Sequence, residues 1–184
     1  MPIYISGLAS MPKLVRQFDV RDLVSVINAE AQPPTPPEIS SDRHHRCSVD
    51  DIVESRPGHT VPQSEHIAEL IEFLHSWDTH TGLLIHCMAG VSRSTAVGLI
   101  AHVLKTNDVH RSVMDLRRAA PYAWPNRRIV SLADSILGLN GKLNRALAEM
   151  GPANWQSDAE YVVPRLHESD VRGSGPGRCA TLIV

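Results

Sequence analysis

The sequence has little net charge, few cysteines and no long apolar run. Its 184 residues carry a formal charge of −2, so bulk electrostatics predict no nucleic-acid partner and no membrane partner. No segment approaches the length of a membrane span, and the first residues lack the basic and apolar regions of a secretory signal. Three unclustered cysteines do not make a disulfide framework, which favours a reducing, cytoplasmic setting.

The length and composition are those of one globular domain with a full hydrophobic core. Helix and strand patterns run through residues 1–150 and end near Gly151. We therefore expect one folded domain over residues 1–150, followed by a partly flexible C-terminal extension over residues 151–184. Within that extension, Arg172–Arg178 has the composition of a flexible linker and residues 179–184 form a small apolar end.

Alternating strand and helix patterns predict an α/β fold with a central, mainly parallel sheet of four to five strands and helices on both faces. Short apolar or β-branched runs predict strands over residues 3–8, 22–28, 44–49 and 83–87. Helical apolar spacing predicts helices over residues 11–18, 62–77, 92–105, 111–120 and 127–149. Four prolines in residues 33–37 predict an extended surface loop, with a ligand for a proline-binding module as the alternative.

The most informative stretch covers residues 86–95, between an apolar strand and an apolar helix. A loop that opens a helix collects backbone N–H groups and the helix dipole at one point, which makes an anion site. In that field, and beside Arg93, Cys87 is expected to favour the thiolate, the nucleophilic form. Gly90 allows the backbone to turn inward, and the planar fork of Arg93 matches two phosphate oxygens.

Two further residues of this stretch have chemical uses. Ser94 can donate its hydroxyl proton to the cysteine sulfur, and His86 can orient the loop through backbone carbonyls. The order His-Cys, five residues, then Arg-Ser resembles the signature of the cysteine-dependent protein tyrosine phosphatases. The form Gly-Val-Ser-Arg-Ser over residues 90–94 looks most like the dual-specificity branch of that family.

The resemblance implies a phosphatase that hydrolyses phosphomonoesters through a cysteinyl-phosphate, with Cys87 as the nucleophile. It also implies that the phosphate is bound by Arg93 and by the loop residues Met88, Ala89, Gly90, Val91 and Ser92. No metal or cofactor is expected, because Arg93 and the loop amides supply the positive field.

Phosphoryl transfer to a leaving oxygen needs a proton donor, which in the resembled family is an aspartate some distance before the cysteine. Asp51 fits best, although it lies somewhat further from the cysteine than is usual. Asp50 is the alternative, and Glu54 and Asp42 are outside candidates. Whichever aspartate is not the acid is expected to be an ordinary loop carboxylate.

Four residues near the last predicted helix leave open choices. In the resembled family an asparagine at the place of Asn126 lies near the phosphate loop, whereas a plain helix cap is the alternative. Trp124 either lines the mouth of the pocket or packs in the core. Arg117 and Arg118 are expected on a solvated face, with a role in substrate docking as the alternative.

The residues 44–49 contain two histidines and a cysteine. His44 and His45 suggest a metal site, but neighbours in a strand point to opposite faces, so ordinary strand histidines are favoured. Cys47 could form a protective disulfide with Cys87, and a buried strand cysteine is the alternative.

The variable loop positions bear on the substrate. In the resembled family, lysines in the loop accompany inositol phosphates, whereas Met88, Ala89 and Val91 are uncharged. A phosphorylated protein or a small phosphoester is therefore expected. The alternatives are a phospho-ligand-binding pseudophosphatase and another anion-loop thiol enzyme, of the sulfurtransferase or arsenate reductase type. The sequence indicates no oligomeric state.

Overall fold

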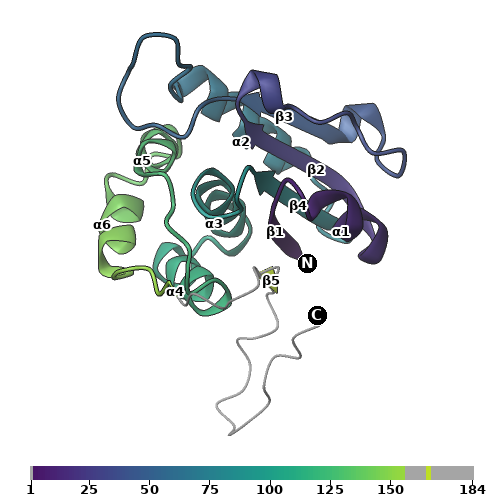
Figure 1. The fold of residues 1–184 in the computed structure, drawn as a ribbon. Coiled ribbons are helices and arrows are strands. Elements are labelled where there is room, and N and C mark those ends of the chain that lie inside the picture. The colour runs from purple at the N-terminus through teal and green to yellow at the C-terminus, as the bar shows by residue number, and fades with distance from the viewer. Residues whose placement is uncertain (1, 156–164, 167–184) are drawn as a thin grey trace, which may run out of the picture.

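A five-stranded sheet forms the centre of the fold in the computed structural model, which describes residues 2–155 and 165–166 (Figure 1). The strands are β1 (Ile3–Gly7), β2 (Val20–Ile27), β3 (His44–Ser48), β4 (Gly82–Cys87) and β5 (Arg165–Leu166). They lie in the order β3-β2-β4-β1-β5. The first four are parallel and β5 pairs antiparallel with β1, so the predicted mainly parallel sheet is confirmed.

Helices cover both faces of the sheet, as predicted (Figure 1). They are α1 (Met11–Gln17), α2 (Ser64–Ser76), α3 (Arg93–Thr106), α4 (Val109–Ala119), α5 (Arg127–Ile136) and α6 (Lys142–Glu149). Helix α1 packs with β2 and β4 in a smaller apolar cluster, and α2 to α6 enclose the main core on the other face. Single 3-10 turns occur at Ala29–Ala31 and Ser41–Arg43, and the predicted proline loop between them has no regular structure.

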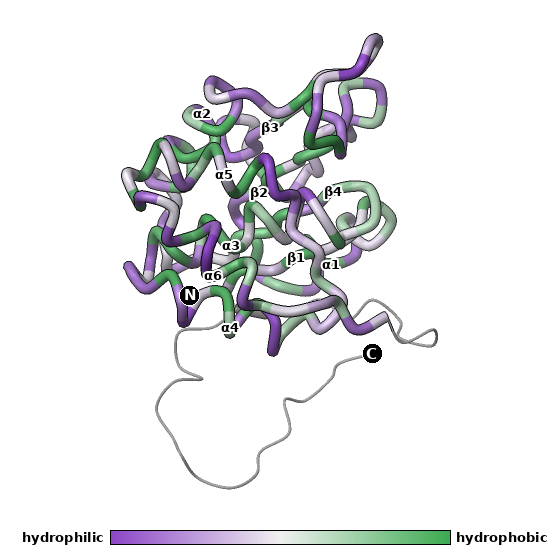
Figure 2. The backbone as a smooth tube through the Cα atoms, turned by 90° about the vertical axis from the view of Figure 1, so that its left-hand side faces the viewer, coloured by the Kyte–Doolittle hydropathy of each residue, from purple (hydrophilic) through white to green (hydrophobic). Residues whose placement is uncertain are grey.

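Helix α3 is the most buried helix because it packs directly on the sheet. A Cβ atom at Gly98 would lie 2.5 Å from Cδ1 of Ile5, so a larger residue there would have to displace the Ile5 side chain or the helix. Helices further out alternate hydrophobic and hydrophilic residues along the backbone, as amphipathic helices do (Figure 2). The sheet and α3 therefore form a rigid base for the loop that joins β4 to α3.

The single last helix expected over residues 127–149 is wrong, because two helices occupy this segment. The chain turns between them at Gly138, Asn140 and Gly141, whose φ angles are 63°, 55° and 80°. Such left-handed backbone interrupts a helix. The carboxylate of Asp134 then caps α6, accepting hydrogen bonds from the amides of Gly141 at 2.6 Å and Leu143 at 2.7 Å.

The expectation for the two arginines at the end of α4 holds for one of them. Arg118 is exposed and pairs with Asp115 at 2.8 Å. Arg117 is half-buried and donates to four backbone carbonyls, those of Pro121, Ala123, Met150 and Gly151. It ties α4 to the end of α6, so the prediction of a solvated side chain at Arg117 is wrong.

Part of the C-terminal segment joins the sheet, since β5 pairs with Ile3 and Tyr4 of β1. The linker expected at Arg172–Arg178 and the apolar end at residues 179–184 lie outside the described residues. Among the described helices, none has both the length and the hydropathy of a bilayer span.

Candidate active site

The carboxyl ends of the four parallel strands meet at one edge of the sheet, and the loop of residues 88–92 lies there, between β4 and α3. Open α/β sheets bind ligands at this edge. All six residues of β4 are buried, as are the first eleven residues of α3, so both ends of the loop are anchored in the core.

Cys87 lies at the floor of this loop, where its side chain is only 2% exposed. Its sulfur accepts a hydrogen bond from the amide of Gly90 at 3.2 Å and lies 3.1 Å from the hydroxyl of Ser94. His86 Nδ1 lies 3.3 Å from the carbonyl oxygen of Cys87. Two donors directed at one sulfur stabilise a thiolate, which is an acceptor only.

The Arg93 guanidinium is also buried, at 5% exposure. Its Nη1 donates to the carbonyl of Val49 at 2.8 Å, and the Asp51 carboxylate lies 3.9 Å from its Nε. That Nε makes no hydrogen bond within the described part of the chain. A buried cation with an unused donor is costly unless an anion binds it, so the arrangement favours an anionic ligand.

The end of β1 supports the loop from below. Gly90 has a φ angle of +79°, and a Cβ atom there would lie 2.7 Å from the Gly7 amide nitrogen and from the Ser6 carbonyl carbon. The amide of Leu8 donates to the carbonyl of Met88 at 3.1 Å. Only glycine satisfies both the backbone conformation and this close approach.

Several loop amides have no acceptor of their own. Within the described residues, the amides of Ala89, Val91 and Ser92 donate no hydrogen bond to the protein. Met88 is 50% exposed and Ala89 is exposed as well, so this side of the loop faces solvent. Unused amides beside a helix N-terminus form an anion-binding concavity.

Asp51 is the carboxylate that the structure brings to this loop. Its Oδ1 accepts from the Ser92 hydroxyl at 2.7 Å and from Asn126 Nδ2 at 2.9 Å. The segment that carries it, between β3 and α2, lies beside α5, where Arg128 donates to the carbonyl of Val53 (Figure 1). The acid candidate, the loop and α5 are therefore linked directly.

The other three carboxylates lie elsewhere. Asp50 accepts from the amide of Thr60 at 2.8 Å and closes the base of its own loop. Asp42 is paired with Ser40 in an exposed turn, and Glu54 is exposed. The geometry thus favours Asp51 among the four candidates, whereas Asp50 makes the contact expected of a loop carboxylate.

Asn126 both caps a helix and contacts a side chain beside the loop, the two alternatives that the sequence left open. Its side-chain oxygen caps α5 by accepting from the amides of Arg128 and Ile129, each at 3.1 Å, while its nitrogen donates to Asp51. The amide of Trp124 donates to the carbonyl of Val91 at 3.0 Å. The Trp124 side chain is 48% exposed, so it does not pack in the core. It lines a cavity of about 560 Å³ together with residues of α6, and no residue of the loop 88–92 lines that cavity.

Sequence reasoning missed Val49, which contributes a carbonyl, and Ser25, a buried residue of β2. Ser25 Oγ lies 2.6 Å from His86 Nε2 and 2.7 Å from His44 Nε2. Burial lowers the pKa of both histidines to about 4, and nearby positive charge adds to the effect. His45 stacks on Phe73 of α2, so the two neighbouring histidines do point to opposite faces.

A disulfide between Cys47 and Cys87 does not fit the sheet. Cys47 pairs with Val26, and the pairing of β2 with β4 continues to Cys87 on the opposite side of Val26. Two strand spacings separate the cysteines by roughly 10 Å, beyond the reach of a disulfide. Burial raises the pKa of the Cys47 thiol to about 12, so Cys47 has the character of a buried core cysteine.

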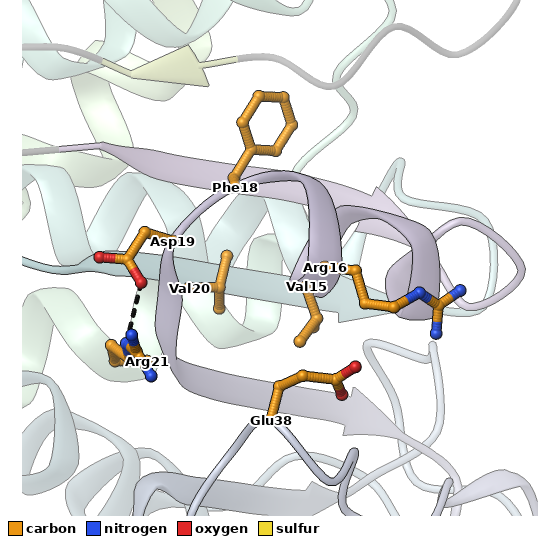
Figure 3. A pocket seen from close by; sticks show the side chains of 7 residues that line it. All are labelled: Val15, Arg16, Phe18, Asp19, Val20, Arg21 and Glu38. Atoms are coloured by element: carbon orange, nitrogen blue, oxygen red, sulfur yellow. Dashed lines mark ion pairs between the residues drawn. The ribbon is translucent and has the colours of Figure 1, made fainter.

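A second cavity, of about 360 Å³, lies beside α1 and the start of β2 (Figure 3). Asp19 and Arg21 form an ion pair of 2.9 Å at its edge. None of the residues predicted for the site lines this cavity. The chemistry-bearing side chains are gathered at the β4–α3 loop instead.

Comparisons with known proteins agree with this geometry. The chain is 36% identical over 142 residues to dual specificity protein phosphatase 15 of Rattus norvegicus, covering 73% of this chain and 56% of the relative. The same phosphatase of Mus musculus is 37% identical over 84 residues, covering 44% of this chain and 33% of the relative. The chain thus spans about half the length, or less, of the curated relatives that it matches. No protein-family model matches it.

Solved structures share the fold. The crystal structure of DUSP15 has a TM-score of 0.55 at 22% identity, covering 83% of this chain and 94% of that one. The crystal structure of human DUSP28 has a TM-score of 0.56 at 17% identity, covering 76% and 94%. At these identities the likeness concerns the fold.

Replacing Gly90 should destroy the anion loop. The Gly90→Ala variant is expected to lose phosphate-dependent thermal stabilisation, because its Cβ atom meets the backbone of β1 in addition to the strained φ. Gly138→Ala is the matched control, since Gly138 also has a positive φ (+63°) but has open space around it. Equal phosphate-dependent stabilisation of the two variants, measured by thermal melts with and without phosphate, would contradict this account of the loop.

The free energy of unfolding should fall as the pH decreases from about 6.5 to about 4. His44 and His86 are buried and neutral, so the unfolded chain binds protons in this window before the folded protein does. Urea unfolding at several pH values should give a shallower slope for His44→Gln. An exposed control, His75→Gln, should keep the slope of the wild type. Identical slopes in all three proteins would show that the buried ring does not titrate in this way.

Proposed function

Because the chain resembles the dual-specificity branch of the cysteine-dependent protein tyrosine phosphatases in sequence and in fold, we propose that it hydrolyses phosphomonoesters through a cysteinyl-phosphate. The observation that supports this most is the convergence of a thiol, a buried guanidinium and a carboxylate on one loop. Cys87 would be the nucleophile, Arg93 the phosphate ligand and Asp51 the general acid.

In the first step, the phosphate binds to the amides of the loop and to the unused Nε of Arg93. The thiolate of Cys87 attacks phosphorus, so that a P–S bond forms while the bond to the leaving oxygen breaks. Asp51 donates a proton to that oxygen. Ser92 and Asn126 hold the Asp51 side chain in place through its Oδ1. Preorganised donors stabilise the charge on the transferring group.

In the second step, a water molecule attacks phosphorus and the P–S bond breaks. The Asp51 carboxylate accepts the proton of the water, which returns the acid to its protonated form. The departing sulfur carries the negative charge. The hydroxyl of Ser94, 3.1 Å from the sulfur, and the amide of Gly90 stabilise it. The reaction needs no metal or cofactor in this scheme.

The substrate class is a phosphorylated protein or a small phosphoester. Met88, Ala89 and Val91 bring no charge to the loop, so a ligand with several phosphates would gain little from them. Similarity to dual specificity phosphatases makes the pseudophosphatase, sulfurtransferase and arsenate reductase alternatives less favoured. We place the activity in residues 1–150 and expect a reducing, cytoplasmic compartment, which keeps the thiol reduced, with neither nucleic acid nor membrane as a partner.

Replacing the nucleophile should separate binding from turnover. Cys87→Ser is expected to abolish release of p-nitrophenol from p-nitrophenyl phosphate while phosphate binding is retained, because serine is a far weaker nucleophile in the same loop. Cys47→Ala removes the other described thiol and should keep turnover and its inhibition by vanadate. Normal turnover by Cys87→Ser would refute the covalent route, whereas a wild type that binds phosphate without turnover would favour the pseudophosphatase.

The two aspartates should differ sharply in their contribution to kcat. Asp51→Asn is expected to lower kcat by about 10²- to 10⁴-fold, the usual contribution of a general acid. The loss should be larger for phenyl phosphate than for p-nitrophenyl phosphate, because the poorer leaving group depends more on a proton. Asp50→Asn keeps an oxygen for the Thr60 amide and should leave kcat close to that of the wild type. The opposite order of effects would make Asp50 the acid.

A further inference from the structure

A buried hydrogen-bonded row of side chains runs behind the nucleophile, on the α1 side of the sheet. Ser25 of β2 lies between two imidazole rings, with its hydroxyl 2.6 Å from His86 Nε2 and 2.7 Å from His44 Nε2. The other nitrogen of His86 lies 3.3 Å from the Cys87 carbonyl. All three side chains of the row are buried. The mechanism above uses none of them chemically.

The row continues to the surface through the proline-rich loop. His44 Nδ1 lies 3.0 Å from the Thr35 hydroxyl, which accepts a hydrogen bond from Arg46 Nη2 at 2.8 Å. Thr35 lies between Pro34 and Pro36, so its backbone is restricted on both sides. Gln32, at the start of this loop, donates to the carbonyl of Ile27 at 3.1 Å and fastens the loop to β2. The Thr35 hydroxyl is thus presented by a stiff segment.

The Cys87 carbonyl fixes the direction of every bond near the nucleophile. A carbonyl only accepts, so His86 Nδ1 must carry the proton, and Nε2 of the neutral ring must accept. The single hydroxyl proton of Ser25 is then used on His86. Ser25 must therefore accept from the ring of His44, whose Nε2 carries the proton.

The bonds of His44 and Thr35, toward the surface, have a fixed direction as well. With the proton of His44 on Nε2, its Nδ1 must accept, and the hydroxyl of Thr35 must donate to it. The oxygen of Thr35 keeps lone pairs for the Arg46 guanidinium, which only donates. No other assignment satisfies all five contacts with neutral rings. Burial, which lowers the pKa of both rings to about 4, keeps them neutral at ordinary pH.

We propose that Ser25, His44 and Thr35 are positioning residues, which hold His86 in its Nδ1–H tautomer and thereby fix the backbone of the nucleophile. We call this row, from Arg46 to His86, the histidine relay. It gives the proline-rich loop a part in the site, because the Thr35 hydroxyl is the donor that satisfies the buried Nδ1 of His44 in this tautomer. The expected effect of the relay on the rate rests on the proposed phosphatase function. The tautomers of the two rings do not depend on that function.

Plain core packing does not account for this row. A core position of this size is filled more cheaply by an apolar side chain, because two imidazoles and a hydroxyl must be desolvated. The row is also fully satisfied only in one direction, and it ends on the residue that carries the reactive sulfur. A fully satisfied buried network fixes one geometry among several of similar energy.

Thr35→Val is the decisive variant, because it removes the hydroxyl at nearly constant shape. Long-range ¹H–¹⁵N correlation spectra should show Nε2–H for His44 and Nδ1–H for His86 in the wild type. In Thr35→Val, His44 should lose this single tautomer, the His86 signals should shift, and kcat should fall on the order of tenfold with little change in KM. Thr35→Ser restores the hydroxyl and should restore both readouts. Thr79→Val, a threonine outside the relay, should resemble the wild type.

Three results would overturn the relay. The opposite tautomer of either ring in the wild type would exclude the assigned direction. Unchanged histidine signals and an unchanged kcat in Thr35→Val would show that the surface end has no effect on the loop. Equal losses in Thr35→Val and Thr35→Ser would assign the effect to packing. A wild type without turnover would refute the phosphatase function instead, and the tautomers and vanadate affinity of the same variants would still decide the relay.

Discussion

The structure of the site depends on where the buried guanidinium of Arg93 is held. Its bond to the Val49 carbonyl joins the start of α3 to the end of β3, and Asp51 follows two residues later. One side chain therefore connects the loop next to the thiol with the segment that carries Asp51. Removing a cation from water costs several kcal/mol, which one carbonyl and a carboxylate 3.9 Å away offset only in part. A bound dianion would supply the remaining compensation.

The parallel sheet makes this arrangement possible because it brings four strand ends to the same edge. β4 lies between β2 and β1, so its terminal loop has a neighbour on each side. On the β1 side, Gly7 lies against the backbone of the loop. On the β2 side, Ser25 holds His86, and β3 beyond it contributes His44 and the residue after its end, Val49. Each strand therefore contributes a different kind of support to the loop.

The sequence predicted those parts of the site that are local in the chain. The strand, loop and helix around Cys87 follow from a continuous stretch in which each residue type has a separate chemical use. Asp50 and Asp51 could not be separated with the same certainty, since adjacent residues of a loop differ only in the direction that their side chains take. Val49 acts through a backbone carbonyl, which any residue would supply. Ser25 did carry a signal, as a hydroxyl inside an apolar strand.

The prediction of one helix over residues 127–149, where two are present, was wrong for a similar physical reason. An apolar stripe continues through both α5 and α6, because both pack on the same core, so periodicity alone predicts one helix. The helix is interrupted at residues that adopt a positive φ, namely Gly138, Asn140 and Gly141. The carboxylate of Asp134 then caps the second helix. Local backbone chemistry prevailed over the hydrophobic pattern there.

The loop of residues 88–92 concentrates features that each destabilise a folded protein. It contains a left-handed backbone at Gly90 and amides that find no acceptor among the described residues, and it is flanked by a buried thiol, Cys87, and a buried cation, Arg93. Such features persist only where the surroundings determine the geometry more strongly than the loop itself. Here β4 is buried along its whole length, and α3 rests on β1 through Gly98. The loop has no freedom to relax into a conformation that would satisfy its own amides. A ligand that carries its own acceptors would recover that free energy on binding, which is the physical reason for proposing an anion at this loop.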